Sequence, residues 1–409
     1  MRTVSLCGDP WEGVRRARMK RRRNVGIIGI GQTYHKAHRR DVNEVEMVNE
    51  AVRACLEDAE MTPEEIDCFV HGNMELFEGN YQPDLWHVEG FGGVMRSGFR
   101  VTTGGTTGST LACAADHLVA SGLYEVVMAV GFEKQELGST TTAITAMADP
   151  LWARNIQTGA ISGTTGAVLI DRFGERADIA AAKLRVIAAN NARLNPYAHL
   201  KLNLTIDDVR NSYVLAWPLR LYHMCPESNG ACAVIFASEE FIKRKSLKHK
   251  PVFIRDSITV HREESFSLYP EGGAEFVDVS HAYASKTLLG RNGFKNPVKE
   301  IDVFEMYDPS SWWALDWMTP FLWLEPGENI DLVEQGATEI TGEIPIGPSG
   351  GVVSTNPIGA TALIRVAEAA LQVRGTAGPH QVPKRVKWAL ASGFGGTFWT
   401  VLHLLTDEA

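Results

Sequence analysis

The sequence has few cysteines, no long apolar stretch and no excess of positive charge. Its 409 residues include six cysteines, at positions 7, 55, 68, 113, 225 and 232, and they form no Cys-x-x-Cys pair. A structural zinc site and a disulfide framework are therefore not expected. No apolar run approaches the roughly 18 residues that predict a membrane span. The net charge of −9 argues against a general nucleic-acid-binding protein, and we expect a reduced, cytoplasmic setting.

The first 24 residues differ from the rest of the chain. Eight of them are Lys or Arg and two are acidic, which gives a net charge of +6, and no apolar segment typical of a secretory signal follows. Two interpretations remain open. The segment is a basic arm that binds an acidic partner, or it is a disordered extension, for example from a start codon upstream of Met19. We favour the second.

Strand and helix patterns alternate from residue 25 onward. Residues 25–31 read as a short buried strand, and their Gly-x-x-Gly-x-Gly spacing, followed by polar residues, is not typical of a dinucleotide-binding turn. Apolar residues on one stripe predict a helix over residues 43–59, and a strand is expected over residues 66–70. This order predicts a parallel or mixed sheet covered by helices.

The most informative feature is an internal repeat of roughly 150 residues. Residues 101–122 and 353–375 each begin with small residues and continue into a helix that ends near a glycine. Residues 129–133 and 391–395, which follow them, each read as a strand that closes in a glycine turn. Two paired motifs in the same order indicate one α/β unit present twice, with an insertion in the first copy at about 135–225.

With this repeat, the sequence resembles the thiolases, closest to their sterol-carrier-protein-type branch. Cys-Pro-Glu-Ser-Asn-Gly-Ala-Cys-Ala-Val-Ile at 225–235 resembles the segment that ends the family's loop domain. Lys-Pro-Val-Phe-Ile-Arg at 250–255 resembles the start of its second half. Gly-Glu-Ile-Pro-Ile-Gly-Pro-Ser-Gly-Gly at 342–351 resembles the approach to its Gly-His-Pro motif. The resemblance covers nearly the whole chain, from about Val25 to Leu405.

The resemblance implies an α/β protein with the thiolase fold, a duplicated five-layered αβαβα sandwich with an inserted loop domain. Each copy contributes a buried central helix whose N-terminus faces the active site, where free N–H groups stabilise negative charge. We expect a basic extension at 1–24, an N-terminal thiolase half at 25–254 that contains the loop domain at about 135–225, and a C-terminal half at 255–409.

The chain departs from the family at its catalytic positions. The nucleophilic Cys lies three residues before the glycine of the first buried helix, and this sequence has Gly105 there. The His of Gly-His-Pro is replaced by Asn356, and the second catalytic Cys is absent because no cysteine follows Cys232. The family's His-Asp pair corresponds to Tyr307-Asp308. Without the nucleophile, we expect the protein to act on an acyl-CoA without forming a cysteine acyl-enzyme.

The groups that remain suit the stabilisation of an enolate. Backbone N–H groups after Gly105 and around Ser392 and Gly393 could bind an oxyanion, and the Asn356 amide could polarise a thioester carbonyl. The resemblance extends to the steroid side-chain-cleaving aldolases of the superfamily, which also have glycine at the nucleophile position and a Tyr-Asp pair. This chain lacks their later tyrosine and has Pro357 in that region. The candidate catalytic residues are Gly105, Tyr307, Asp308, Asn356, Ser392 and Gly393.

The leading hypothesis is an acyl-CoA carbon–carbon lyase, a retro-aldolase that cleaves a β-hydroxyacyl-CoA with a bulky side chain. It would have no permanently bound cofactor or metal, and a coenzyme A thioester would be its substrate. Two alternatives remain. One is a non-catalytic acyl-CoA-binding or lipid-carrier subunit of a thiolase-like complex. The other is an acyltransferase or Claisen-type condensing enzyme without a covalent intermediate.

Each candidate residue also has a simpler interpretation. Tyr307 is expected to accept the β-hydroxyl proton, for which its pKa, ordinarily about 10, would have to be lowered, or it is a buried core tyrosine. Asp308 could instead cap a helix that begins at Pro309, and Asn356 could cap the second buried helix. His71 lines a pocket or packs in the core, and Cys113 is expected in the core rather than as a displaced nucleophile.

The substrate and the partners are predicted in outline only. Four tryptophans could form the wall of a bulky apolar site or belong to a helical core; they are Trp312, Trp313, Trp317 and Trp323. The resemblance implies that the 135–225 region binds coenzyme A, with Lys183, Arg185 and Lys201 among the possible phosphate ligands. It also implies a homodimer formed through edge strands of the N-terminal half, and a small zinc-ribbon/OB-fold acyl-CoA-binding partner protein.

Overall fold

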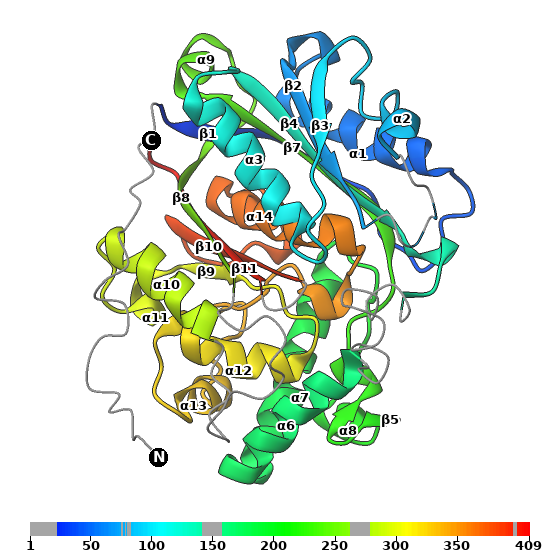
Figure 1. Cartoon of the computed structure of the whole chain (residues 1–409). Helices are drawn as coiled ribbons and strands as arrows, with labels where there is room; N and C mark the ends of the chain where they lie inside the picture. Colours follow the sequence, from blue (N-terminus) through cyan, green and yellow to red (C-terminus); the bar gives the residue numbers. More distant parts are fainter. Residues whose placement is uncertain are drawn as a thin grey trace, which may run out of the picture.

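The computed structural model of the chain describes residues 23–74, 77, 79, 83–140, 158–261, 279–395 and 399–409 (Figure 1). Nearly all of the basic segment predicted at 1–24 lies outside these residues. Among the described residues, no helix has the length and apolar character needed to cross a membrane.

One large mixed sheet forms the centre of the molecule, and its strands follow the order β3-β2-β4-β7-β1-β8-β11-β10-β9. Its strands are β1 (Val25–Gln32), β2 (Cys68–Gly72), β3 (Ser97–Arg100), β4 (Val126–Lys134), β7 (Asn229–Ser238), β8 (Val252–His261), β9 (Val303–Glu305), β10 (Trp388–Gly395) and β11 (Trp399–Thr406). β2 begins two residues later than expected because Pro63–Glu65 forms a short 3₁₀ helix and Ile66 ends it.

The strand order is symmetric about the contact between β1 and β8. On one side, β2 is parallel to β3 and β4, and β7 is antiparallel to β4 and β1. On the other side, β9 is parallel to β10, β11 is antiparallel to β10 and β8, and Ile346 pairs in parallel with Phe304 where β3 would stand. The two halves join through only two residue pairs of β1 and β8. This arrangement confirms the duplication that the internal repeat predicts.

The helices form layers on both faces of the two half-sheets. They are α1 (Glu44–Ala59), α2 (Pro83–His87), α3 (Thr107–Ser121), α9 (Glu239–Arg244), α10 (Val279–Arg291), α11 (Pro297–Glu300), α12 (Ser311–Leu322), α13 (Glu328–Glu334) and α14 (Ile358–Arg374). Alternate residues of β4 pack in opposite directions: Met128 joins the cluster under α1, and Val127 joins the one that contains α3 and α14. Likewise Leu390 of β10 packs with α10 and α12. The layers are therefore those of the thiolase fold.

The helices α3 and α14 lie side by side between the half-sheets (Figure 1). They approach closely because Gly108 has no side chain; an ideal Cβ there would lie 3.0 Å from the Leu363 side chain and overlap its backbone nitrogen. α14 ends at Gly375, which has a left-handed φ of 78° that favours glycine. The two central helices thus meet near their N-terminal ends.

The insertion between β4 and β7 contains α6 (Thr158–Phe173), α7 (Glu175–Leu194), α8 (Ile206–Arg210) and the hairpin of β5 (Val214–Ala216) and β6 (Leu219–Arg220). α6 and α7 pack against α12 of the second copy. The insertion thereby reaches the C-terminal half. The domain limits given above stay a prediction, and β8 crosses the limit at 254/255.

Candidate active site

Gly105 lies just before α3, at the position that the sequence predicts for the family nucleophile. An ideal Cβ at Gly105 would lie 2.6 Å from the carbonyl oxygen of Phe394, 3.1 Å from the hydroxyl oxygen of Tyr307 and 3.2 Å from Cα of Gly395. The backbone of β10 and a tyrosine hydroxyl thus occupy the space that a side chain would need. The structure accommodates glycine here without strain, and any larger residue would displace its neighbours.

Tyr307 follows β9 and is 5% exposed. Its backbone N–H donates to Oγ of Ser392 (2.8 Å), and its ring belongs to a cluster that includes Val352, Cys225 and Phe394. Burial, together with the nearby acidic groups, raises its pKa well above the ordinary value. The lowered pKa expected for a proton acceptor is therefore wrong, because the phenolate would lose its hydration. Tyr307 is a neutral phenol.

Asp308 is a buried carboxyl beside this tyrosine. Its Oδ1 accepts the N–H of Val352 (2.6 Å), and burial raises its pKa to about 7. It does not cap α12. Ser310 does so, with its Oγ accepting from the N–H of Trp312 (3.2 Å), so the capping interpretation of Asp308 is wrong. A carboxyl with this pKa exchanges protons readily near neutrality.

Asn356 lies just before α14, and three bonds hold it. Its backbone N–H donates to Oγ of Ser228 (3.0 Å), and its Oδ1 accepts from Oγ1 of Thr361 (2.8 Å). Its Nδ2 donates to Sγ of Cys225 at 3.2 Å. Among the described hydrogen bonds, no backbone N–H of α14 donates to the Asn356 side chain, so Asn356 does not cap this helix. The N-cap residue is Pro357, which makes no side-chain hydrogen bond. The amide N–H group faces Cys225 instead of the helix.

The two central helices differ at their N-termini. The buried Glu133, at the end of β4, accepts the N–H groups of Gly359 (2.9 Å) and Met74 (3.0 Å). The repeat places Gly395 at the matching position of the second copy, where an ideal Cβ would lie 2.6 Å from the nitrogen of Gly105 and overlap that of Thr106. An internal carboxylate therefore fills the N-terminus of α14, whereas the matching residue at α3, Gly395, has no side chain. The sequence already contains this difference, because the first turn reads Phe132-Glu133 and the second reads Phe394-Gly395.

Two other predicted residues lie inside the sheet. Ser392 and Gly393 belong to β10 and pair with Leu402 and Val401 of β11. The Ser392 hydroxyl holds the backbone of Tyr307, and Gly393 allows close packing because a Cβ there would overlap Ser109. The structure therefore brings Ser392 next to Tyr307 but places Gly393 against α3.

Most of the remaining candidates are core residues. His71 is buried in β2 and stacks on Phe91 with a ring distance of 4.4 Å, and burial lowers its pKa to about 4. Cys113 is buried within α3. Trp313 and Trp317 stack at 5.2 Å, and both rings contact Phe394.

The other two tryptophans belong to the same region: Trp312 is buried and Trp323 is half-buried. The tryptophan group supports the strand that ends beside Gly105.

The basic residues of the insertion divide into two kinds. Lys183 pairs with Glu339 (3.6 Å), and the ammonium group of Lys201 donates to the carbonyl of Pro196 (3.1 Å). Arg185 is wholly buried, and its Nη1 lies 3.5 Å from Oγ of Ser354. Burial lowers its pKa to about 10, while the charge of Asp308 acts in the opposite direction. Arg185 therefore belongs to the surroundings of Asp308 rather than to the surface.

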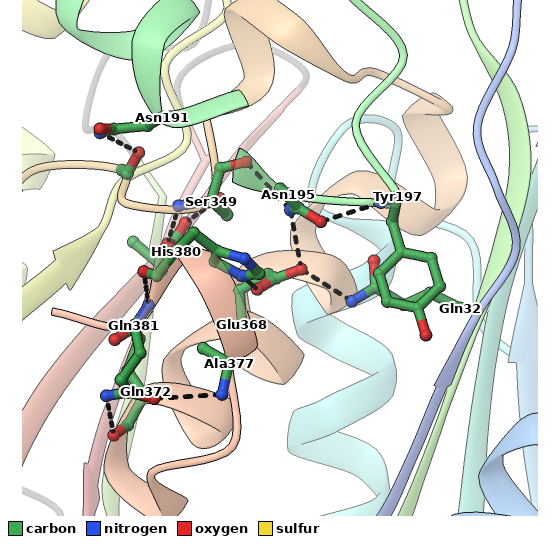
Figure 2. Close-up of polar contacts among 12 residues, drawn as sticks. Gln32, Asn191, Asn195, Tyr197, Ser349, Glu368, Gln372, Ala377, His380 and Gln381 are labelled. Atoms are coloured by element: carbon green, nitrogen blue, oxygen red, sulfur yellow. Dashed lines mark hydrogen bonds and ion pairs between the residues drawn. The ribbon is translucent and has the colours of Figure 1, made fainter. Parts of the chain in front are cut away.

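A buried polar network that sequence reasoning missed lies behind this region. Figure 2 shows Glu368 of α14 bound to His380 (2.8 Å), to Nε2 of Gln32 (2.9 Å) and to Nδ2 of Asn195 (3.2 Å). Arg365 lies about one turn earlier in α14 and forms an ion pair with Glu305 at 2.6 Å. Glu305 is the last residue of β9, two residues before Tyr307. The sequence contains a signal for this network, because the charged residues Arg365 and Glu368 lie within the mostly apolar helix α14.

No group of three or more His, Cys, Asp and Glu side chains suited to a metal ion occurs within the described part of the chain.

Comparisons with known proteins agree with this architecture. A family model for the "Thiolase C-terminal domain-like" region matches residues 280–407. The acetyl-CoA acetyltransferase of Methanothermobacter thermautotrophicus is 29% identical over 396 residues, covering 94% of this chain and all of that protein. Sterol carrier protein 2 of Oryctolagus cuniculus is 28% identical over 401 residues, covering 93% of this chain and 71% of that protein.

The solved structure of the Ltp2-ChsH2(DUF35) aldolase superposes with a TM-score of 0.78, at 23% identity, over 94% of this chain and 98% of that one. At this identity the likeness concerns the fold. The duplicated sheet, the paired central helices and these relatives lead to one conclusion: the chain has the thiolase fold, its residues 280–407 match the thiolase C-terminal domain-like family, and nearly its whole length is similar to sterol carrier protein 2.

Proposed function

We propose that this thiolase-like protein is an acyl-CoA carbon–carbon lyase that cleaves a bulky β-hydroxyacyl-CoA by a retro-aldol reaction. The observation that carries this proposal is at position 105. The nucleophile is missing, and the Tyr307 hydroxyl lies 3.1 Å from where its Cβ would stand. Such a site cannot form the cysteine acyl-enzyme of a thiolase at this position, but it keeps a proton-bearing group beside a helix N-terminus.

The N-terminus of α3 is the proposed binding place for the thioester oxygen. Cleavage of a β-hydroxyacyl-CoA leaves an enolate, whose oxygen is negatively charged. Backbone N–H groups at a helix start stabilise such a charge because they are fixed in direction and need no reorganisation. Glu133 supports this assignment, since its carboxylate accepts a backbone N–H at the N-terminus of α14, the matching helix of the second copy.

Proton transfer is assigned to two adjacent residues. Asp308, with a pKa near 7, is the base that receives the β-hydroxyl proton, directly or through the Tyr307 hydroxyl. The O–H electron pair forms the carbonyl of a ketone or aldehyde, the carbon–carbon bond breaks, and its electrons form the enolate of the shortened thioester. Protonation of the α-carbon then completes the reaction.

Two observations favour a second candidate, an acyl transfer. The relative named acetyl-CoA acetyltransferase is 29% identical, and a cysteine, Cys225, lies in the site beside Asn356. Burial raises the pKa of Cys225 to about 12, so that its thiolate is scarce at neutral pH. We therefore prefer the lyase.

The remaining parts of the proposal concern partners. We place coenzyme A against the insertion at 135–225 and expect a homodimer. A small zinc-ribbon/OB-fold partner is supported by the neighbouring structure, which is named as an assembly of Ltp2 with ChsH2(DUF35). A cytoplasmic location fits the five described cysteines, all of which are free thiols.

The test is a product assay on the whole chain, purified alone and together with a candidate zinc-ribbon/OB-fold protein. A panel of β-hydroxyacyl-CoAs with aliphatic, aromatic and polycyclic side chains is scored for ketone or aldehyde and for the shortened acyl-CoA. Release of both in equal amounts is the expected result. CoA-dependent thiolysis of β-ketoacyl-CoAs, or binding of every ester without turnover, would contradict the lyase and support transfer or a carrier subunit respectively.

A further inference from the structure

Cys225 is a site residue that does not belong to the candidate catalytic residues predicted from the sequence. It stands between the insertion and β7, and its N–H donates to the carbonyl of Pro309 (3.0 Å), next to the Tyr307-Asp308 pair. It is the one half-buried cysteine among the five that the structure describes. Its sulfur lies 3.2 Å from Nδ2 of Asn356 and it packs in the cluster that contains Tyr307.

A second observation shows that this place is built for a ligand. The Tyr307 hydroxyl is on a side chain that is 5% exposed, yet it has no hydrogen-bond partner among the described residues. It lies against Gly105 at the start of α3. A substrate oxygen in this place would give the hydroxyl a hydrogen-bond partner.

The proposed lyase reaction leaves one proton transfer unassigned. The enolate requires a proton at its α-carbon, and neither glycine nor an asparagine amide is an acid. Asp308 has by then received the β-hydroxyl proton. The protonated Asp308 and the Tyr307 phenol are acids in the same site, and Cys225 is a third; its sulfur is the one that faces the amide of Asn356, the residue predicted at the position of the family's histidine.

We propose that the Cys225 thiol protonates the α-carbon of the enolate thioester and that the Asn356 amide stabilises the resulting thiolate. This inference rests on the proposed lyase function. The S–H bond breaks, its proton forms the new C–H bond, and the electron pair stays on sulfur. The thiolate then takes up the proton held by Asp308, directly or through the Tyr307 hydroxyl. The sum is a cleaved bond with no net proton gained or lost.

The surroundings of Cys225 favour an acid over a nucleophile. Burial disfavours its thiolate, so that the group is protonated when the substrate binds. After transfer, the return of a proton from a carboxyl to this thiolate is downhill, because Asp308 is the stronger acid of the two. Covalent acylation would need the thiolate at the start of the cycle.

The test uses exchange of the α-protons of acetyl-CoA and propionyl-CoA in D₂O, followed by mass spectrometry, with the full-length protein and its partner. Exchange passes through the enolate but needs no cleavage. Cys225→Ala should lose about 10²-fold or more in exchange, within the span for general acid catalysis. Cys225→Ser, which keeps the volume but is a far weaker acid, should lose a similar factor. Cys113→Ala, a buried cysteine of α3, serves as the control and should exchange at the wild-type rate.

The outcomes separate this inference from the function on which it rests. If wild type cleaves and exchanges while Cys225→Ser does both at the wild-type rate, the role of Cys225 is overturned and the lyase stands. If wild type neither cleaves nor exchanges, the lyase itself is wrong. An acyl group found on Cys225 by peptide mass spectrometry overturns the acid role in favour of acyl transfer.

Discussion

Tyr307 is the residue on which the proposed chemistry depends most directly. Tyr307→Phe removes only the hydroxyl, and the ring still fills its place among Val352, Cys225 and Phe394. Loss of a proton-transferring group should lower kcat by about 10²–10⁴ with little change in CoA affinity. Steady-state kinetics and a melting curve measure both effects, and Tyr124→Phe, beyond the far end of α3, is the matched control.

A core tyrosine would behave differently under the same change. A near-wild-type kcat together with a lowered melting temperature would remove Tyr307 from the mechanism, and attention would turn to Asp308 and Cys225.

Gly105 is the second residue whose replacement is informative. Gly105→Cys restores the family nucleophile, but its Cβ would lie 2.6 Å from the Phe394 carbonyl, and the family's histidine and second cysteine are absent. Because such groups act as a unit, we expect no useful thiolysis and a destabilised protein. Gly105→Ala should show the same loss of stability, which assigns it to the Cβ. Substantial thiolysis by Gly105→Cys would show that the site has been misjudged.

At the scale of elements, α14 carries charged groups through the interior. Burial alone would raise the pKa of Glu368, but His380, Gln32 and Arg365 outweigh it and lower the value to about 2. Burial likewise lowers the pKa of His380, and the Glu368 carboxylate outweighs it and raises the value. The pair ties α14 to the chain that follows it and, through Asn195, to the insertion (Figure 2).

This pair predicts a pH dependence of stability. Glu368 stabilises the fold above its unfolded pKa of 4.5, and this contribution is lost as pH falls from there toward 2. His380 stabilises the fold below its unfolded pKa of 6.5, and its contribution is lost as pH rises through its higher folded value. Glu368→Gln should therefore cost ~3–5 kcal/mol near pH 6 and flatten both limbs.

Denaturant unfolding at several pH values measures this cost. Glu334→Gln, the same change in an exposed pair with Arg176, is the control and should cost at most about 1 kcal/mol. An equal effect of the two variants would mean that the buried pair contributes no more than a surface one.

The edge strand β3 predicts the dimer. At the opposite end of the sheet, Ile346 pairs beside β9, whereas β3 is the last strand of its side and has exposed apolar neighbours, including Met95 at 97% and Phe99 at 45%. Unpaired strand edges of this kind invite pairing with another chain, and two copies of β3 can pair antiparallel across a twofold axis.

Light scattering tests this pairing. The wild type should be a dimer at micromolar concentration, and Phe99→Glu should weaken it. Leu123→Lys, a change at another exposed apolar residue, should not. A wild-type monomer in the absence of any partner would contradict the prediction.

At the scale of the whole molecule, the candidate site is assembled from three parts of the chain. The first copy of the repeat supplies Gly105, the second supplies Tyr307 and Asn356, and the insertion ends at Cys225. The two copies are alike in strand order but differ in what fills their central helix ends, Glu133 at α14 and the side-chain-free Gly395 at α3. This difference gives a duplicated fold one site instead of two.

Local patterns in the sequence were enough to predict the duplicated fold and the buried central helices, because small-residue turns, glycine helix ends and strand patterns recur in order, and they led to the prediction that Gly105 replaces the nucleophile. They misassigned Asp308, since an Asp-Pro pair is a local capping signal whether or not a later serine makes the cap. Three other properties arise from the packing of distant segments: Cys225 contacts Asn356, burial raises the pKa of Tyr307, and the carboxylate of Glu133 accepts from the N-terminus of α14. These properties depend on contacts between residues up to 226 positions apart and on exclusion of water, neither of which any local pattern records.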